Sequence, residues 1–375
     1  MLVPAYHHGA EVEALVQAGV DPRFYDVYGG LEPRLEDLEA LRSERTRALY
    51  LIHYLGFPQA SGRWRAWCDE HGLLLIEDAA QAWLAETPDG PVGAEADLAV
   101  FCLYKTFGLP DGAALFSRQP PGSPSRRRRP LGVSSQLRRH VAWLEGRSAA
   151  MSRLLDPAHS NQVATLAEEI ALGDPDTKAA SASLRLLARV TDPMAAARRR
   201  ENTERLLAAL GSDLEPLFSE IPAGASPFAF AVATENKRDL LAWLSRRGVR
   251  ALDFWSAAHP RVPPGSFPRS DALRSRVVAL PVHQELRPED VARIGAALKG
   301  FSARPRTALE RVADLETYRD EWDALAATTG NVFSTWEWAA IWWKHFGAGR
   351  TARIVWQSRT KPTDSRSNAG SRPAW

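Results

Sequence analysis

The chain has 375 residues, of which 47 are basic and 45 acidic, and its only cysteines are Cys68 and Cys102. This length allows two or three domains with substantial cores, while the balanced charge provides no broad positive field for nucleic acid. So few cysteines exclude a disulfide-rich secreted scaffold. The sequence has no signal-peptide pattern at its start and no apolar run long enough to span a bilayer. We therefore expect a globular cytoplasmic protein with no nucleic acid or membrane partner.

Predicted strands and helices alternate in the first third of the chain. The predicted strands are Leu2–Val3, Arg23–Val27, Ala48–Ile52, the apolar runs that end at Asp78 and at Lys105, and Ala113–Phe116. The predicted helices are Glu11–Ala18, Leu35–Leu41 and Arg63–Glu70. The last is followed by Gly72, a residue type that favours the left-handed turn after a helix. This order favours right-handed crossovers and an α/β fold with a mostly parallel sheet.

The second half of the sequence predicts a smaller α/β unit. Its predicted helices are Ala195–Leu210, Leu240–Leu244 and Val291–Leu298, and its predicted strands are Phe228–Val232 and Val277–Leu280. Between the two halves, residues 119–130 read QPPGSPSRRRRP and predict a loop. Its arginines either bind phosphate or lie exposed in solvent.

The most informative segments are LLLIEDAAQAWL at 73–84 and DLAVFCLYKTFGLPDGAALF at 97–116. Each is a short apolar run that ends on one charged residue, Asp78 in the first and Lys105 in the second. Runs this apolar are typical of strands buried on both faces. In open α/β sheets the ligand binds beyond the carboxyl ends of the strands. A lone carboxylate and a lone amine at that edge are therefore placed for chemistry.

This pair of side chains suits pyridoxal phosphate as a cofactor. The cofactor aldehyde needs a lysine amine, and the ring nitrogen needs a carboxylate that keeps it protonated. Asp78 can meet the second need, because a buried carboxylate and a facing cation keep one another charged. The alternative is structural: Asp78 would cap the next helix and Lys105 would be a solvated strand end.

The surrounding residues favour the cofactor. The string EDAAQAW at 77–83, followed by Gly93, Asp97 and FCLYKTFGLPDGAALF at 101–116, resembles the DegT-type sugar aminotransferases, which are fold type I pyridoxal phosphate enzymes. Further segments are similar to that family in the same order: LVPAYHHG (2–9), PRFYDVY (22–28), LIHYLGFP (51–58) and ALPVHQELRPEDVARI (279–294). The resemblance covers roughly residues 1–300.

The resemblance implies a role for several residues. Lys105 would bind the cofactor aldehyde covalently, Asp78 would hold the ring nitrogen, and Gln81 would contact the ring hydroxyl. His8 lies where the family has an aromatic side chain stacked on the ring; the alternative is a polar loop formed by His7 and His8. We expect no metal site, because no carboxylate or cysteine sits at ligand spacing near these histidines. The family also implies a homodimer, an amino acid as donor and a keto sugar nucleotide as acceptor.

Other positions are expected to surround the same site. His53 ends a predicted strand at this edge, so we expect it to line the site without catalysing. Cys102 stands where the family has a serine, which implies that a hydroxyl contact to the cofactor phosphate is absent there. Ser160–Asn161 resembles the family element that reaches the phosphate of a neighbouring subunit, and a helix N-cap is the alternative.

The expected domains are a cofactor-binding large domain at 1–150 and a small domain with connecting helices at 151–302. Family members begin with a further segment whose Ser-Gly-Thr turn cradles the cofactor phosphate through backbone amides, so we expect the large domain to be incomplete at its start. Residues 306–356 hold six of the 13 tryptophans and resemble the opening of FemAB-like, GNAT-related acyltransferases. An amphipathic docking helix is the alternative for that segment, and residues 357–375 are predicted to be disordered.

The sequence thus predicts a pyridoxal phosphate-dependent aminotransferase. A truncated, non-catalytic remnant of the family that serves as a binding or scaffold protein is one alternative. A fusion whose main activity is acyl transfer is another.

Overall fold

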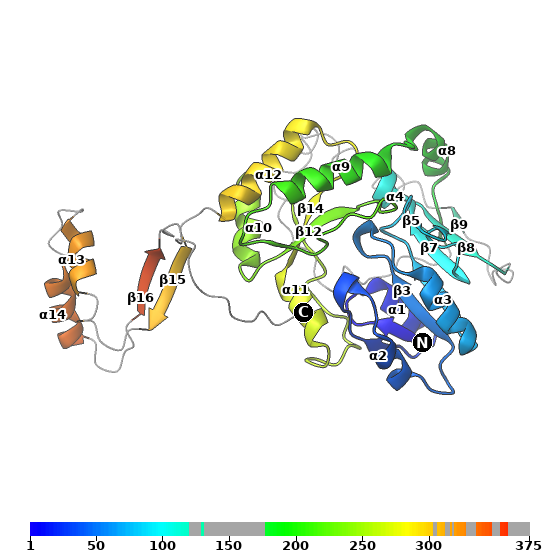
Figure 1. The fold of residues 1–375 in the computed structure, drawn as a ribbon, viewed down its shortest axis with the longest axis horizontal. Coiled ribbons are helices and arrows are strands. Elements are labelled where there is room, and N and C mark those ends of the chain that lie inside the picture. Colours follow the sequence, from blue (N-terminus) through cyan, green and yellow to red (C-terminus); the bar gives the residue numbers. More distant parts are fainter. Residues whose placement is uncertain are drawn as a thin grey trace. The chain divides into compact units, whose positions relative to one another are not determined.

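The computed structural model describes residues 1–119, 129–130, 177–302, 306–311, 316, 319–327, 335–346 and 353–358. The chain divides into two compact units, Met1–Ser302 and Ala303–Trp375 (Figure 1). Ser160, Asn161 and most of the arginine-rich loop lie outside the described residues. Within the part of the chain that is described, no helix is long and apolar enough to cross a membrane.

The first unit contains a six-stranded sheet in the order β2-β1-β3-β4-β7-β8. Its strands are β1 (Leu2–Pro4), β2 (Arg23–Tyr25), β3 (Ala48–Ile52), β4 (Leu74–Asp78), β7 (Leu98–Cys102) and β8 (Ala113–Ser117). All neighbouring strands pair in parallel except β8, which runs antiparallel to β7 at the edge of the sheet. The expected mostly parallel α/β sheet is confirmed.

Helices connect the parallel strands, and short elements follow some of them. The helices are α1 (Ala10–Gln17), α2 (Leu35–Leu41), α3 (Ser61–Glu70) and the short α4 (Leu103–Phe107). The short elements are the 3₁₀ turns η1 (Gly29–Leu31) and η2 (Tyr54–Gly56), the strands β5 (Glu86–Thr87) and β6 (Gly90–Pro91), and the pair β9 (Arg129–Pro130) and β10 (Thr177–Lys178). Gly72 has a φ of 63° after α3, as predicted for a glycine that ends a helix.

Burial of the sheet differs from the prediction. Every residue of β3 is buried, but Leu74 at the start of β4 is 49% exposed. In β8, Leu115 and Phe116 are 56% and 44% exposed. The expectation of strands buried on both faces is therefore wrong for β4, and in β7 only Ala99 is fully buried. Strand β8, for which no such burial was expected, lies at the edge of the sheet.

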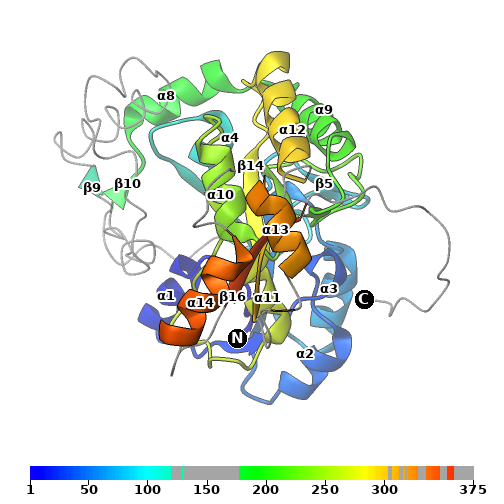
Figure 2. The same cartoon turned by 90° about the vertical axis from the view of Figure 1, so that its left-hand side faces the viewer.

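A second, antiparallel sheet has the order β11-β12-β14-β13. Its strands are β11 (Glu215–Pro216), β12 (Ala229–Ala233), β13 (Leu252–Asp253) and β14 (Val277–Pro281). The helices of this region are α8 (Ser181–Val190), α9 (Ala195–Ala208), α10 (Lys237–Ser245), α11 (Pro268–Arg276) and α12 (Pro288–Ser302) (Figure 2). The predicted helices and strands of the second half are all present, with ends shifted by a few residues.

Strand β12 joins two cores, because alternate residues of a strand face opposite sides. Phe230 and Val232 pack into a core with residues of α9, α10 and α12. Ala229, Ala231 and Ala233 belong to the core of the large sheet. The second sheet is thus packed directly against the first-sheet core.

A close backbone contact fixes the approach of the second region to the large sheet. Gly56 has a φ of 85°, and a Cβ added there would lie 2.0 Å from the carbonyl oxygen of Ser226. The amide of Ser226 donates to the Gly56 oxygen at 2.9 Å, and the amide of Phe228 donates to the Leu55 oxygen at 2.7 Å. Only glycine permits this approach, which locks turn η2 beside the candidate site.

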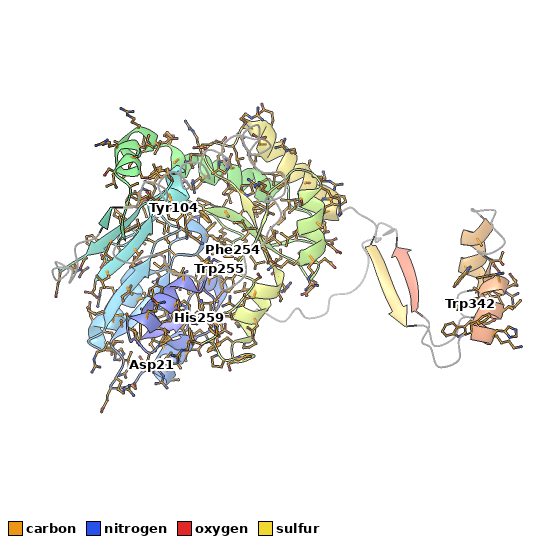
Figure 3. The ribbon with its side chains drawn as sticks, turned by 180° about the vertical axis from the view of Figure 1, so that it is seen from behind. Asp21, Tyr104, Phe254, Trp255, His259 and Trp342 are labelled. Carbon is orange, nitrogen blue, oxygen red and sulfur yellow. The ribbon has the colours of Figure 1, made fainter. Side chains whose placement is uncertain are left out.

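The second unit contains the antiparallel pair β15 (Arg306–Arg311) and β16 (Arg353–Ser358), with helices α13 (Arg319–Ala327) and α14 (Trp336–Phe346). Helix α14 exposes Trp338, Ile341, Trp342 and Phe346 (Trp342 is labelled in Figure 3). The predicted disordered tail at 357–375 is wrong for its first residues, since β16 continues to Ser358; the rest lies outside the described residues. The acyltransferase resemblance of this segment stays a prediction.

Candidate active site

The two predicted site charges follow neighbouring strands of the large sheet. Strand β4 ends at Asp78, and β7 ends at Cys102, where the chain turns at once into α4. Lys105 lies on this short helix, and the prediction of a lysine at a strand end is wrong in that respect. Helix α4 is followed by Gly108, whose φ of 57° is left-handed, a conformation that costs glycine little.

Asp78 is held by hydrogen bonds to both carboxylate oxygens. The Tyr50 hydroxyl donates to Oδ2 at 2.9 Å, and the Ala80 amide donates to Oδ1 at 2.9 Å. Burial, and then the charges of Asp78 and Glu11, raise the pKa of Tyr50 well above its ordinary value, so this phenol stays a donor. Donors of this kind stabilise a carboxylate in its ionised form.

The charges of Lys105 and Asp78 both act on the thiol of Cys102. Burial raises the pKa of the Cys102 thiol, the charge of Lys105 opposes that rise, and the charge of Asp78 adds to it. Lys105 is partly buried. No hydrogen bond or ion pair joins its amine to any residue that the structure describes. The amine is therefore available to bind a carbonyl carbon.

Gln81 is 6% exposed, and its two amide atoms have different surroundings. The side-chain oxygen accepts the backbone N–H of Leu55 at 2.9 Å. Because this partner can only donate, the orientation of the amide group is determined. The Nε2 group has no hydrogen-bond partner among the described residues, so it can donate to a ligand.

His8 is partly buried beside an aromatic cluster. Its ring meets Trp255 edge to face at 6.4 Å between ring centroids. Trp255 in turn stacks on Phe254 at 4.5 Å, and the two lie side by side in Figure 3. Stacking of His8 on a cofactor ring stays a prediction. The alternative, a polar loop formed by His7 and His8, also stays a prediction; the His7 side chain is fully buried.

His53 lies below the site and does not line it. It is fully buried, and its Nε2 lies 3.0 Å from Oε2 of Glu77, which is also fully buried. The Gly93 amide donates to the same Glu77 oxygen at 2.7 Å. Burial alone would raise the pKa of Glu77, but hydrogen bonds and the His53 charge hold that pKa below its ordinary value. The prediction that His53 lines the site is therefore wrong; it braces the end of β4.

A cavity of about 700 Å³ borders helix α4. Its lining includes Lys105, Thr106, Arg199, Arg250 and Gln284, but neither Asp78 nor Gln81. The fully buried Arg199 donates to the Thr106 carbonyl at 2.9 Å, and the side-chain amide of Gln284 donates to the same oxygen at 3.0 Å. These two side chains fasten the lysine-bearing helix to α9 and to the segment that follows β14.

Sequence reasoning missed Tyr50, Glu11 and Glu77 as members of this region. Tyr50 lies in an apolar strand, where a tyrosine is ordinarily a core residue. Glu11 lies in the first turn of a helix, where an acidic residue usually serves the helix dipole. Nothing local in the sequence connects Tyr50 with Asp78, and the pairing of β3 with β4 brings the two together.

The described residues fit the reactive parts of pyridoxal phosphate. Asp78 offers a carboxylate oriented by two hydrogen-bond donors, and Gln81 and Lys105 offer an N–H donor and an amine that no described residue engages. No group of three His, Cys, Asp or Glu side chains within the described ranges is arranged to hold a metal ion. The side chains of Asp78, Gln81 and Lys105 thus suit the ring nitrogen, the ring hydroxyl and the aldehyde of this cofactor.

Known proteins are similar to this chain in sequence. GDP-perosamine synthase of Vibrio cholerae is 32% identical over 120 residues, which cover 31% of this chain and 33% of that protein. The dTDP-3-amino-3,4,6-trideoxy-alpha-D-glucose transaminase of Streptomyces venezuelae is 25% identical over 327 residues, covering 81% of this chain and 76% of that protein. The chain therefore spans about a third of the first relative and three quarters of the second.

Solved structures show the same fold. The crystal structure of Streptomyces venezuelae DesV in complex with a ketimine intermediate aligns with a TM-score of 0.58 at 22% identity, covering 81% of this chain and 78% of that one. The sequence profile of the DegT/DnrJ/EryC1/StrS aminotransferase family matches residues 1–122 and 176–299. These matches confirm the expected aminotransferase class and fold. This chain belongs to the DegT/DnrJ/EryC1/StrS aminotransferase family.

Proposed function

We propose that this protein uses pyridoxal phosphate to transfer an amino group from an amino acid to a keto sugar nucleotide. The proposal is supported by Asp78 at the end of β4, Gln81 shortly after it, and Lys105 on the short helix that follows the neighbouring strand β7. The relatives support the substrate class, since one is a GDP-perosamine synthase and another a dTDP-amino sugar transaminase. The family resemblance also supports a homodimer that works in the cytoplasm.

Each residue has a defined task in this proposal. When bound, pyridoxal phosphate supplies an aldehyde and an electron-withdrawing ring. The Asp78 carboxylate would hold the N–H of the protonated ring, and Gln81 Nε2 would donate to the ring hydroxyl. Lys105 Nζ would hold the cofactor aldehyde, and as a free amine it would move a proton to and from the substrate carbon.

The fold supports these tasks by restricting the side chains. The Tyr50 and Ala80 hydrogen bonds orient Asp78, and the Leu55 amide orients Gln81. Arg199 and Gln284 hold the backbone of α4 one residue beyond Lys105. A preorganised site of this kind avoids the cost of ordering these groups during the reaction.

The test is spectroscopic. The full chain incubated with pyridoxal phosphate is expected to develop a visible absorption band from the covalently bound cofactor, and Lys105→Ala is expected to lack it. Lys299→Ala, an exposed lysine of α12, is the matched control and should keep the band. A wild-type chain without the band contradicts the aminotransferase proposal and favours the non-catalytic binding alternative. With the band established, transfer from glutamate to a keto sugar nucleotide tests the substrate class.

A further inference from the structure

The cavity beside helix α4 has walls that the proposed mechanism does not use. Its volume is about 700 Å³, which is within the range of cavities that enclose a drug-sized organic ligand. Lys105 lines it, and residues of β12 and β14 form further walls. A cavity shared with Lys105 can therefore hold a part of the substrate other than the group that reacts.

Arg250 is an uncommitted cation of this cavity. It lies shortly before β13 with an exposed side chain, and it forms no hydrogen bond or ion pair with any residue in the described part of the chain. Asp290, an acid of the same lining, is engaged by Arg287 at 3.0 Å and by Arg293 at 2.9 Å, two arginines outside the lining. Since Lys105 is assigned to the cofactor aldehyde, Arg250 remains available to bind an anionic group of the substrate.

Arg199 adds a buried positive charge to the same lining, since its side chain is only 1% exposed. Its guanidinium donates to three neutral oxygens: the Gln284 side chain at 2.8 Å, the Thr106 carbonyl at 2.9 Å and the Pro227 carbonyl at 3.2 Å. Burial lowers the pKa of Arg199 to about 10, and the charge of Glu285 opposes this shift. No carboxylate of a described residue forms an ion pair with Arg199. A buried charge without a contacting counter-ion is costly, so an anion bound in this cavity offsets part of that cost.

The lining also exposes apolar side chains. Tyr104, the residue before Lys105 on α4, is 44% exposed, and Leu252 on β13 is 53% exposed. Both line the cavity, and Tyr104 is labelled in Figure 3. An exposed aromatic ring can stack on a nucleobase of any kind, because every base has a flat π face. A cation and an aromatic surface in one cavity thus match the two parts of a nucleoside diphosphate.

On the basis of the function proposed above, we propose that this cavity is the subsite for the nucleoside diphosphate part of the acceptor. Arg250 binds the phosphate oxygens, since a guanidinium can pair with two of them at once. The buried charge of Arg199 stabilises the same anion without contacting it, and the Tyr104 ring stacks on the base. The volume of the cavity and its aromatic wall favour the nucleotide over the carboxylate of the amino donor, which needs neither.

The test uses the full chain without cofactor, so that it does not depend on the chemistry at Lys105. The probes are dTDP and GDP, the nucleoside diphosphates in the names of two relatives, and their dissociation constants are measured by titration calorimetry. Arg250→Ala is expected to weaken the binding of both about tenfold, as for the loss of a hydrogen bond to a charged group. Arg250→Lys keeps the charge and should retain part of the affinity. Arg246→Ala, an exposed arginine after α10 that does not line the cavity, is the matched control and should bind as the wild type does.

The aromatic wall is tested separately. Tyr104→Ala is expected to weaken the binding of dTDP and GDP about fivefold or more, because the stacking surface is lost. Tyr104→Phe keeps the ring and should keep the affinity. Phe116→Ala is the control, because Phe116 is equally exposed, at 44%, but lies on β8 outside the lining.

Glutarate, a dicarboxylate without an amino group, represents the amino donor in the same titrations. Equal affinity of the wild type and Arg250→Ala for dTDP and GDP overturns the subsite. A loss confined to glutarate also overturns it and assigns Arg250 to the amino donor. Either result, in a chain whose Lys105-dependent absorption band is intact, leaves the aminotransferase proposal standing. Arg250-dependent nucleotide binding in a chain that lacks the band supports the subsite and overturns the catalytic role.

Discussion

The hydroxyl of Tyr50 donates a hydrogen bond to the Asp78 carboxylate, with Oη 2.9 Å from Oδ2. The two residues sit on adjacent parallel strands, β3 and β4, paired so that Tyr50 lies opposite Ile76 and Ile52 lies opposite Asp78. The register therefore aims a core tyrosine at the carboxylate that we propose as the partner of the cofactor ring nitrogen.

Tyr50→Phe removes this donor and is expected to weaken binding of pyridoxal phosphate about tenfold, since a hydrogen bond to a charged group contributes about 1.5 kcal/mol or more. Equilibrium titration of the cofactor measures the effect. Tyr25→Phe is a matched control, because it removes an equally buried phenol that donates to the Tyr50 carbonyl and not to Asp78. Equal affinities in Tyr50→Phe and Tyr25→Phe contradict the role given to Tyr50.

Two substitutions at Gln81 separate its structural contact from its ligand contact. Gln81→Leu leaves the buried Leu55 amide unpaired and should lower the free energy of unfolding by about 1–3 kcal/mol. Gln81→Glu keeps an oxygen for that amide but removes the Nε2 donor, so it should weaken cofactor binding with a smaller loss of stability. Urea unfolding and cofactor titration are measured on both variants. A Gln81→Glu chain that binds the cofactor as tightly as the wild type excludes Gln81 as a ring contact.

The Glu77 carboxylate should make stability depend on pH in the acid range. Its pKa in the folded protein lies below the ordinary value. The stabilisation that the Glu77 carboxylate provides is therefore complete above its pKa in the unfolded chain, about 4.3. It is lost as the pH falls through its pKa in the folded protein. In Glu77→Gln we expect a lower free energy of unfolding at neutral pH and a flatter decline between about pH 5 and about pH 3. Chemical denaturation across this range provides the measurement, and parallel curves for the two proteins contradict it.

Gly93 should resist substitution for steric reasons. Its φ is 92°, its amide donates to Glu77, and an added Cβ would lie 2.9 Å from Cβ of Ala99 and 2.9 Å from the Phe101 ring. Gly93→Ala should lower the free energy of unfolding by about 2–4 kcal/mol, from crowding and from left-handed strain. Gly90→Ala is the control, because Gly90 also has a positive φ, 132°, but has open space around it. Thermal unfolding of both variants isolates the crowding, and equal losses contradict it.

The sequence was sufficient for the large features of this chain. The alternation of apolar runs and amphipathic segments predicted the strands β1, β3, β4 and β7 and the helices between them, because periodicity and turn residues such as Gly72 act locally. Placing Asp78 and Lys105 near the same edge also needed only the parallel order, since the carboxyl ends of parallel strands share one side of the sheet. The family motifs then predicted the cofactor, and the matching family profile confirmed the family.

Only the tertiary structure decided how the charged residues are surrounded. It moved Lys105 from a strand end onto α4, buried His53 against Glu77, and directed the Tyr50 hydroxyl at Asp78. The protonation and hydrogen bonding of a side chain depend on neighbours that are distant in the sequence, and on how much water they exclude. Local sequence patterns do not show which residues these neighbours are. The sequence therefore determined which chemical groups reach the site, and the packing of the strands determined which of them act on one another.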